Sequence, residues 1–182
     1  MPSDSAPATA HLLLRASRDA DLPAITAIYG HAVRHGRASF ELQPPDETEM
    51  AARRERLLQG GFPYVVAELD GEVAGYAYAG PYRPRPAYGA TVENSVYVRE
   101  DRQGCGIGLA LLLRLVEEAE KAGFRQMIAV IGDSANQGSI RLHERAGFDL
   151  IGTMRSVGWK HERWLDTVMM QRALGPGDGT PR

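Results

Sequence analysis

The chain has 182 residues, 43% of them hydrophobic and 24% charged, which is ordinary for a soluble globular protein of one domain. The net charge of −2 and the absence of a Lys/Arg-rich run argue against nucleic acid and against an anionic membrane as partners. A single cysteine excludes an internal disulfide and fits a reducing compartment. No apolar run approaches the roughly 20 residues that span a bilayer. We therefore expect a cytoplasmic protein.

The two ends of the chain differ in composition from the part between them. Residues 1–10 are rich in Ser, Ala, Pro and Thr, and residues 175–182 in Gly and Pro, so both are expected to be disordered tails. Residues 11–174 contain neither a linker nor an internal repeat. We expect them to form a single domain.

The first elements expected are a strand and two helices. The strand is LLLRAS at 12–17, and Asp19 or Asp21 can cap the helix that follows it. A second helix begins within 44–50, where prolines and acidic residues suit a helix N-terminus, and it ends near Gln59.

Strands follow these helices. The segment 64–80 contains two β-rich runs that meet at Asp70-Gly71, a favoured two-residue turn, and therefore predicts a hairpin. The segment TVENSVYVR at 91–99 predicts a further strand.

The second half alternates helices and strands. A helix is expected over 107–122, a buried strand over 126–132 and a short helix over 136–148. Two strands, at 149–159 and 163–174, end the pattern. The order β-α-α-β-β-β-α-β-α-β-β predicts an α/β (α+β) fold around one mixed sheet.

Three alternating glycines, Gly104, Gly106 and Gly108, stand directly before the long helix. Small residues let a backbone approach an anion, and the free N–H groups of a helix start point at it. A Walker A loop needs Lys and Ser or Thr here, and a dinucleotide fingerprint needs a glycine where Leu109 stands, so neither pattern fits. From the glycines alone, a phosphate site and a plain turn into a core helix remain equally open.

Two segments around this helix extend the pattern, VYVREDRQGCGIG at 96–108 and NQGSIRLHERAGF at 136–148. They resemble the signatures of the GNAT superfamily of acetyl-CoA-dependent N-acetyltransferases. Further segments, AYAGPYRPRPAY, VENSVYV and VGWKHERWLDTVMMQ, look like its phosphinothricin/methionine sulfoximine acetyltransferase branch, and the resemblance covers residues 12–174. It implies a central mixed, mostly antiparallel sheet flanked by helices, acetyl-CoA as cosubstrate, and a homodimer.

The resemblance also implies how the cofactor is held. The strand at 96–98 would pair its backbone with the pantetheine arm, the glycine loop would hold the pyrophosphate, and Asn136 and Ser139 would contact the cofactor from the other side. The implied cofactor-binding residues are Val96, Tyr97, Val98, Gln103, Gly104, Cys105, Gly106, Ile107, Gly108, Leu109, Asn136 and Ser139.

Acetyl transfer from a thioester to an amine needs a base, donors for the developing oxyanion and an acid for the departing thiolate. Glu93 matches the catalytic acidic residue of the branch and can act as the base if its surroundings raise its pKa. His143 stands where many family members have a tyrosine, and it can donate a proton or bind substrate. A backbone N–H near Tyr97 and Val98 is the expected oxyanion donor. Without the resemblance, a strand-end glutamate and a structural histidine would account for both side chains.

The implied substrate is the amino group of a small amino acid that carries a phosphinate, sulfoximine or sulfone. Arg83 and Arg85 flank Pro84 in a stiff loop and suit a carboxylate, although solvated loop charge would also explain them. The expected substrate-binding residues are Phe40, Arg83, Arg85, Tyr88, Asn94 and Ser95.

Two other functions stay open, namely transfer to a different amine such as a protein N-terminus or a polyamine, and a non-catalytic acetyl-CoA-binding module.

Cys105 lies between the phosphate-binding glycines, so it is not expected to carry the acetyl group. His31 and His35 share a helix face without a nearby acidic partner, and no metal site is expected. Glu162 replaces the usual small residue of the branch in KHERW, with an effect that the sequence leaves open.

Overall fold

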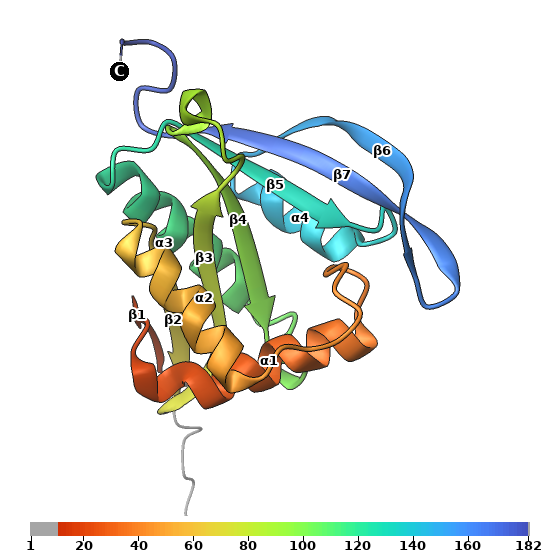
Figure 1. Cartoon of the computed structure of the whole chain (residues 1–182). Helices are drawn as coiled ribbons and strands as arrows, with labels where there is room; N and C mark the ends of the chain where they lie inside the picture. Colours follow the sequence, from red (N-terminus) through yellow and green to blue (C-terminus); the bar gives the residue numbers. More distant parts are fainter. Residues whose placement is uncertain (1–10, 182) are drawn as a thin grey trace, which may run out of the picture.

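The computed structural model describes residues 11–181, so the tail predicted at 1–10 lies outside the described residues. Seven strands form one sheet in the order β1-β2-β3-β4-β5-β7-β6 (Figure 1). The strands are β1 (Leu12–Ala16), β2 (Tyr64–Leu69), β3 (Glu72–Pro81), β4 (Thr91–Val98), β5 (Gln126–Gly132), β6 (Asp149–Lys160) and β7 (Arg163–Ala173). Among the strands of residues 11–181, only β4 and β5 are parallel neighbours. The predicted mixed, mostly antiparallel sheet is confirmed.

Four helices cover the two faces of the sheet, and three short 3-10 helices join elements. These are α1 (Leu22–His35), α2 (Glu47–Gln59), α3 (Ile107–Lys121), α4 (Gln137–Arg145), η1 (Asp19–Asp21), η2 (Pro86–Tyr88) and η3 (Glu100–Arg102). Every α-helix and strand that the sequence predicts is present, and the 3-10 helices are additional. Between residues 11 and 181, no helix is long and apolar enough to cross a membrane.

Each face of the sheet has its own hydrophobic core. Val65 and Ala67 of β2 point into the core beneath α3, whereas Tyr64 and Val66 point into the core beneath α1 and α2. This alternation follows from the two-residue period of a strand, because successive side chains point to opposite faces. Figure 1 accordingly shows α2 in front of the sheet and α3 behind it.

The sheet is split between its two central parallel strands. Among the described residues, β4 pairs with β5 only from Thr91 to Asn94, opposite residues 126–129. Beyond these pairs the two strands diverge, which leaves an opening in the middle of the sheet (Figure 1). The residues at the ends of both strands border this opening.

The connection between α1 and α2 spans the opening, and we call residues 36–46 the bridging loop. The ring of Phe40 lies so close to Gly132 and Gly158 that a Cβ at either glycine would overlap it. Lys160 of β6 donates from Nζ to the carbonyl of Ser39 over 2.7 Å, and is itself buried. The bridging loop therefore ties the N-terminal helices to β5 and β6.

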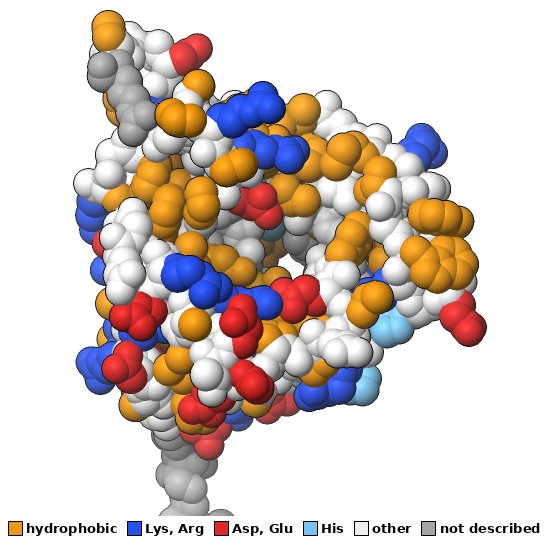
Figure 2. All heavy atoms as spheres, in the orientation of Figure 1, with side chains coloured by type: hydrophobic (Ala, Val, Ile, Leu, Met, Phe, Trp, Pro, Cys, Tyr) orange, Lys and Arg blue, Asp and Glu red, His pale blue; other side chains and the backbone are white. Residues whose placement is uncertain are grey.

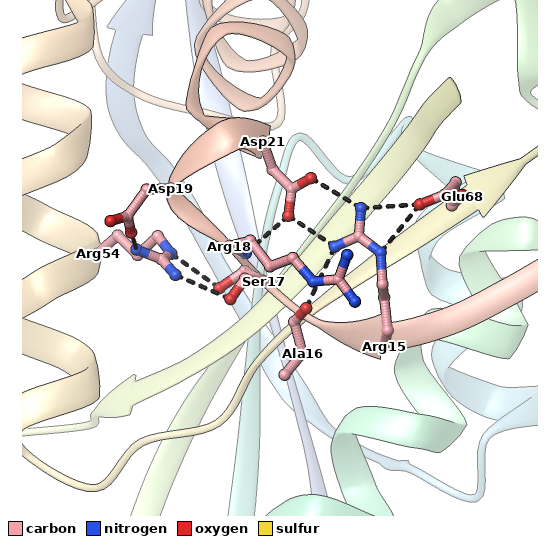
Figure 3. Close-up of polar contacts among 8 residues, drawn as sticks. All are labelled: Arg15, Ala16, Ser17, Arg18, Asp19, Asp21, Arg54 and Glu68. Carbon is pink, nitrogen blue, oxygen red and sulfur yellow. Dashed lines mark hydrogen bonds and ion pairs between the residues drawn. The ribbon is translucent and has the colours of Figure 1, made fainter. Parts of the chain in front are cut away.

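Polar contacts at the other end of the sheet hold α2 and η1 to β1 (Figure 3). Arg54 donates to Ser17 Oγ, to the Ser17 carbonyl and to Asp19 Oδ1, each over 2.8 Å. Arg15 makes a bidentate pair with Asp21, over 2.7 and 2.8 Å. Burial opposes ionisation of Asp21, but these hydrogen bonds outweigh it and lower the pKa of its carboxyl. Asp21 occupies the N-cap position of α1, but the predicted side-chain cap is not formed, because its carboxylate bonds Arg15 and the N–H of Arg18 instead.

Residues 175–181 follow β7 as a series of turns. Arg125 donates to Thr180 Oγ1 over 2.7 Å and to the carbonyl of Pro181 over 3.1 Å.

Candidate active site

A cavity of about 1080 Å³ lies between α1, the edge of β4 and the first turns of α3 and α4. Ten of the predicted cofactor-binding residues line it, namely Val96, Tyr97, Val98, Gln103, Gly104, Gly106, Gly108, Leu109, Asn136 and Ser139. The two others lie elsewhere, since Cys105 is exposed on the loop and Ile107 is buried in the core beneath α3. Residues that are 40 positions apart in the sequence, such as Val96 and Asn136, therefore line the same cavity.

The glycine loop has the backbone conformation that an anion site needs. Gly104 and Gly106 have φ angles of 75° and 81°, a left-handed conformation that residues with a Cβ rarely adopt. Gly106 precedes α3 and offers no side chain to cap it, so the first N–H groups of the helix remain available. These N–H groups and the helix dipole attract negative charge.

The edge of β4 beside the opening also carries backbone groups that no strand pairs with, although the Val98 carbonyl accepts from Gln103 Nε2 over 3.4 Å. The N–H of Arg99 donates to the carbonyl of Ala74 on β3, over 2.9 Å. Because alternate residues of an antiparallel strand bond to opposite sides, the backbone groups of Val96 and Val98 point away from β3, toward the opening. This edge can pair with an extended, amide-containing ligand.

Asn136 and Ser139, predicted as a cofactor-binding pair, form the first turn of α4. Asn136 Oδ1 accepts the N–H of Ser139 over 3.2 Å and thereby caps the helix. The same cavity touches both residues and the glycine loop, so α4 forms its second wall.

Glu93 is the half-buried carboxylate of β4. Burial raises the pKa of Glu93 above its usual value, and the positive charge of Arg83 opposes that rise. Glu93 shares its sheet face with Ser95, which lies opposite Tyr78 of β3. The face seen in Figure 2 is hollowed at its centre, where the ribbons of β4 and β5 separate in Figure 1, and charged side chains border the hollow.

His143 and Asn94 meet on the other face of the sheet. His143 Nδ1 lies 2.8 Å from the carbonyl of Ser139, and Nε2 lies 3.0 Å from Asn94 Oδ1. Asn94 Nδ2 donates to the carbonyl of Ile128, which turns Oδ1 toward His143. Both histidine contacts are hydrogen bonds only when each ring nitrogen carries a proton, whereas burial lowers the pKa of His143. Both side chains line a second, smaller cavity between β4 and β5.

The structure groups some of the predicted substrate-binding residues and separates others. Arg83, Arg85 and Tyr88 are exposed in the loop before β4, where the Arg83 guanidinium lies 5.1 Å from the ring centre of Tyr82. Phe40 belongs to the bridging loop. Asn94 points to the opposite sheet face from Glu93 and Ser95, yet Asn94 and Ser95 both line the smaller cavity, whereas Glu93 lines neither cavity.

Sequence reasoning missed a polar network beside this site. Tyr29 donates to Glu41 Oε1 over 2.9 Å and lies 3.1 Å from Ser39 Oγ, and Arg53 pairs with Glu41. These residues come from α1, the bridging loop and α2. No local spacing in the sequence links them.

The expectation that His31 and His35 have no acidic neighbour is wrong for His31. Its Nε2 lies 3.0 Å from Glu100 Oε2, because η3 folds back against α1. Within residues 11–181, no cluster of three His, Cys, Asp or Glu side chains could hold a metal ion.

Comparisons with known proteins agree with this geometry. The model of the acetyltransferase (GNAT) family matches residues 27–148. The chain is 55% identical to a phosphinothricin N-acetyltransferase of Alcaligenes faecalis, over 92% of this chain and 85% of that protein. It is 44% identical to an L-methionine sulfoximine/L-methionine sulfone acetyltransferase of Pseudomonas paraeruginosa, over 89% of this chain and 94% of that protein.

A solved structure is also similar to this chain in sequence and in fold. The crystal structure of a GNAT superfamily phosphinothricin acetyltransferase from Sinorhizobium meliloti, in complex with AcCoA, superposes with a TM-score of 0.91 at 49% sequence identity. The match covers 93% of this chain and 92% of that one.

Proposed function

Since the chain belongs to the GNAT family of acetyl-CoA-dependent N-acetyltransferases, we propose that its acceptor is the amino group of a small amino-acid-like substrate such as L-phosphinothricin, methionine sulfoximine or methionine sulfone. One observation carries the proposal. Glu93, a half-buried carboxylate with a raised pKa, lies on the strand whose open edge lines the large cavity. The names of the relatives support the choice of substrate.

Glu93 is the proposed general base. Bound acetyl-CoA supplies the thioester carbonyl, and an amine that is protonated at neutral pH must first lose a proton. A raised pKa makes the Glu93 carboxylate a stronger base. It takes the proton directly or through one water. The backbone N–H of Val98, which points into the opening, is the proposed donor to the carbonyl oxygen.

His143 is proposed to protonate the departing thiolate. It lines the small cavity between β4 and β5, together with Asn136 and Ser139 of the cofactor-binding set. Burial lowers the pKa of His143, which makes the protonated ring a stronger acid.

The loop before β4 is proposed to hold the substrate. Arg83 and Arg85 offer planar guanidinium groups to a carboxylate or a phosphinate, and Arg83 is close enough to affect the pKa of Glu93. Ser95, on the same sheet face as Glu93, is the proposed polar contact at the strand, and Tyr88 and Phe40 are proposed to line the pocket.

We further propose a cytoplasmic homodimer. The only cysteine, Cys105, is exposed and free, as expected in a reducing compartment. Large hydrophobic side chains are exposed along β6 and β7, among them Trp159 and Trp164, which are 56% and 62% exposed. Surfaces of this kind mark protein–protein contacts.

The reaction is tested by thiol release from acetyl-CoA in the presence of different amines. We expect turnover with L-phosphinothricin, L-methionine sulfoximine and L-methionine sulfone, and little with spermidine or an alanyl peptide. Glu93→Gln should lower kcat by roughly 10²- to 10⁴-fold while the KM for acetyl-CoA changes little, because the carboxylate acts on the amine.

Glu117→Gln is the matched control, since Glu117 is exposed on α3 and does not line the cavity. Turnover of the peptide or the polyamine alone would contradict the substrate class. An unchanged kcat in Glu93→Gln would contradict the role of the base.

A further inference from the structure

The cofactor cavity has a wall with two arginines that the proposed reaction does not use. Arg141 and Arg145 stand four residues apart on α4, so both side chains leave the same face of the helix. Both are exposed and both line the large cavity. Neither forms an ion pair with any residue from 11 to 181, so both guanidinium groups are available to a ligand.

Leu142 fixes the position of these arginines relative to the glycine loop. A Cβ at Gly108 would come within 2.7 Å of Leu142 Cδ1, so α4 packs directly against the first turn of α3. Arg145 follows Leu142 by three residues and Arg141 by four, so it is the neighbour of both on the helix surface. The arginines therefore line the same cavity as the glycine loop, on the helix that packs against the first turn of α3.

The acidic side chains of the cavity contact other residues and not these arginines. Glu100 lies 3.0 Å from His31, and Asp101 contacts Arg99 at 2.7 Å and Arg102 at 3.5 Å. Arg141 and Arg145 thus add two uncompensated positive charges beside the site of the pyrophosphate. CoA has a third phosphate, a monoester on the ribose, which carries nearly two negative charges at neutral pH.

We propose that Arg141 and Arg145 bind the 3′-phosphate of the CoA moiety and make the protein prefer acetyl-CoA to analogues that lack this phosphate. The planar guanidinium fork matches two phosphate oxygens and makes charge-assisted hydrogen bonds with them. The inference rests on acetyl-CoA as cosubstrate. Basic residues near the C-terminus of α4 also stabilise the helix through its dipole, so the test separates binding from folding.

Isothermal titration calorimetry of the full chain with acetyl-CoA and with acetyl-3′-dephospho-CoA tests the proposal without an acceptor amine. We expect the wild type to bind the dephospho ligand about tenfold more weakly, a difference of about 1.4 kcal/mol. In Arg141→Gln/Arg145→Gln, the Kd of acetyl-CoA should rise about tenfold, and that of the dephospho ligand should stay within about twofold.

Arg18→Gln/Arg56→Gln is the matched control, because it removes the same charge from exposed arginines that do not line the cavity. It should keep the wild-type discrimination, and circular dichroism should show the same helix content in all variants. Equal affinity of the wild type for both ligands, or an equal loss for both in the double variant, would overturn the assignment. Failure of the wild type to bind either ligand would instead overturn acetyl-CoA as cosubstrate.

Discussion

Glu93 shows how its neighbours set the properties of one residue. Burial on β4 disfavours its charged form and raises its pKa, while the nearby positive charge of Arg83 favours the charged form. Arg83 is exposed, so water and salt weaken its influence. The base strength of Glu93 therefore depends on a residue that also belongs to the proposed substrate-binding loop.

The pH dependence of kcat/KM tests this coupling. The acidic limb of the profile should reflect ionisation of Glu93, because only the carboxylate accepts a proton. Arg83→Gln removes a charge that lowers the pKa of Glu93, so the limb should move to higher pH.

Arg85→Gln is the control for Arg83→Gln, since the same loop loses one charge without a comparable effect on Glu93. The limb should stay in place in this variant, and added salt should reduce the shift in Arg83→Gln. A limb that moves to lower pH in Arg83→Gln, or that moves equally in both variants, would contradict the coupling.

The sequence predicts the chemistry of these residues better than their positions. The strand period places Glu93 and Ser95 on one face of β4 and Asn94 on the other. It does not show that Asn94 contacts His143, because that contact joins residues 49 apart through the packing of α4 on the sheet. The same holds for Tyr29 and Glu41, which meet only after the bridging loop has folded.

At the scale of elements, the hairpin of β6 and β7 shows where Glu162 lies, which is the turn between the two strands. His161 and Glu162 form its two-residue turn, with φ angles of 49° and 57°. Turns with two positive φ angles strongly favour glycine, as in the Asp70-Gly71 turn, where Gly71 has a φ of 87°. Glu162 does not line either cavity, so its consequence is for stability and not for the site.

Replacing this residue should stabilise the protein. Glu162→Gly removes the backbone strain of the left-handed conformation, which stabilises the folded chain. The greater freedom of glycine in the unfolded chain offsets part of this gain. The free energy of unfolding should therefore rise by about 0.5–1 kcal/mol. Urea unfolding at a fixed protein concentration measures the change. Glu162→Ala is the control, because it removes the charge but keeps a Cβ. Equal stabilisation by alanine would show that charge, and not backbone strain, limits the turn.

Hydrophobic periodicity and turn residues were sufficient to predict the helices, the strands and the Asp70-Gly71 hairpin. They could not predict where β4 and β5 separate, since that depends on how two strands joined through α3 align. The opening that makes the site therefore belongs to the tertiary structure. The packing of the Phe40 ring against Gly132 and Gly158 likewise cannot be predicted from the sequence of either strand alone.

At the scale of the whole molecule, β6 is the edge of the sheet and its surroundings are unusually apolar. Figure 2 shows hydrophobic side chains gathered over the end of the molecule where Figure 1 places β6 and β7. Leu150, Ile151, Met154 and Val157 are exposed on β6, in addition to Trp159 and Trp164, which pack edge-on with ring centres 5.3 Å apart. A long, apolar edge strand is an aggregation hazard unless something covers it. A second copy of the chain would remove the hazard and bury a large apolar area.

The oligomeric state in solution tests this proposal. Light scattering coupled to size-exclusion chromatography should give twice the 19.9 kDa mass of one chain at micromolar concentrations. Leu150→Lys/Val157→Lys places two charges in the contact, where they would be buried without partners, and should yield monomers. Both side chains are exposed in the single chain, so the monomer itself should stay folded. Leu58→Lys, at an exposed position on α2, should leave the dimer intact. A monomeric wild type, or a dimer that tolerates both lysines on β6, would show that this edge is not the contact between copies.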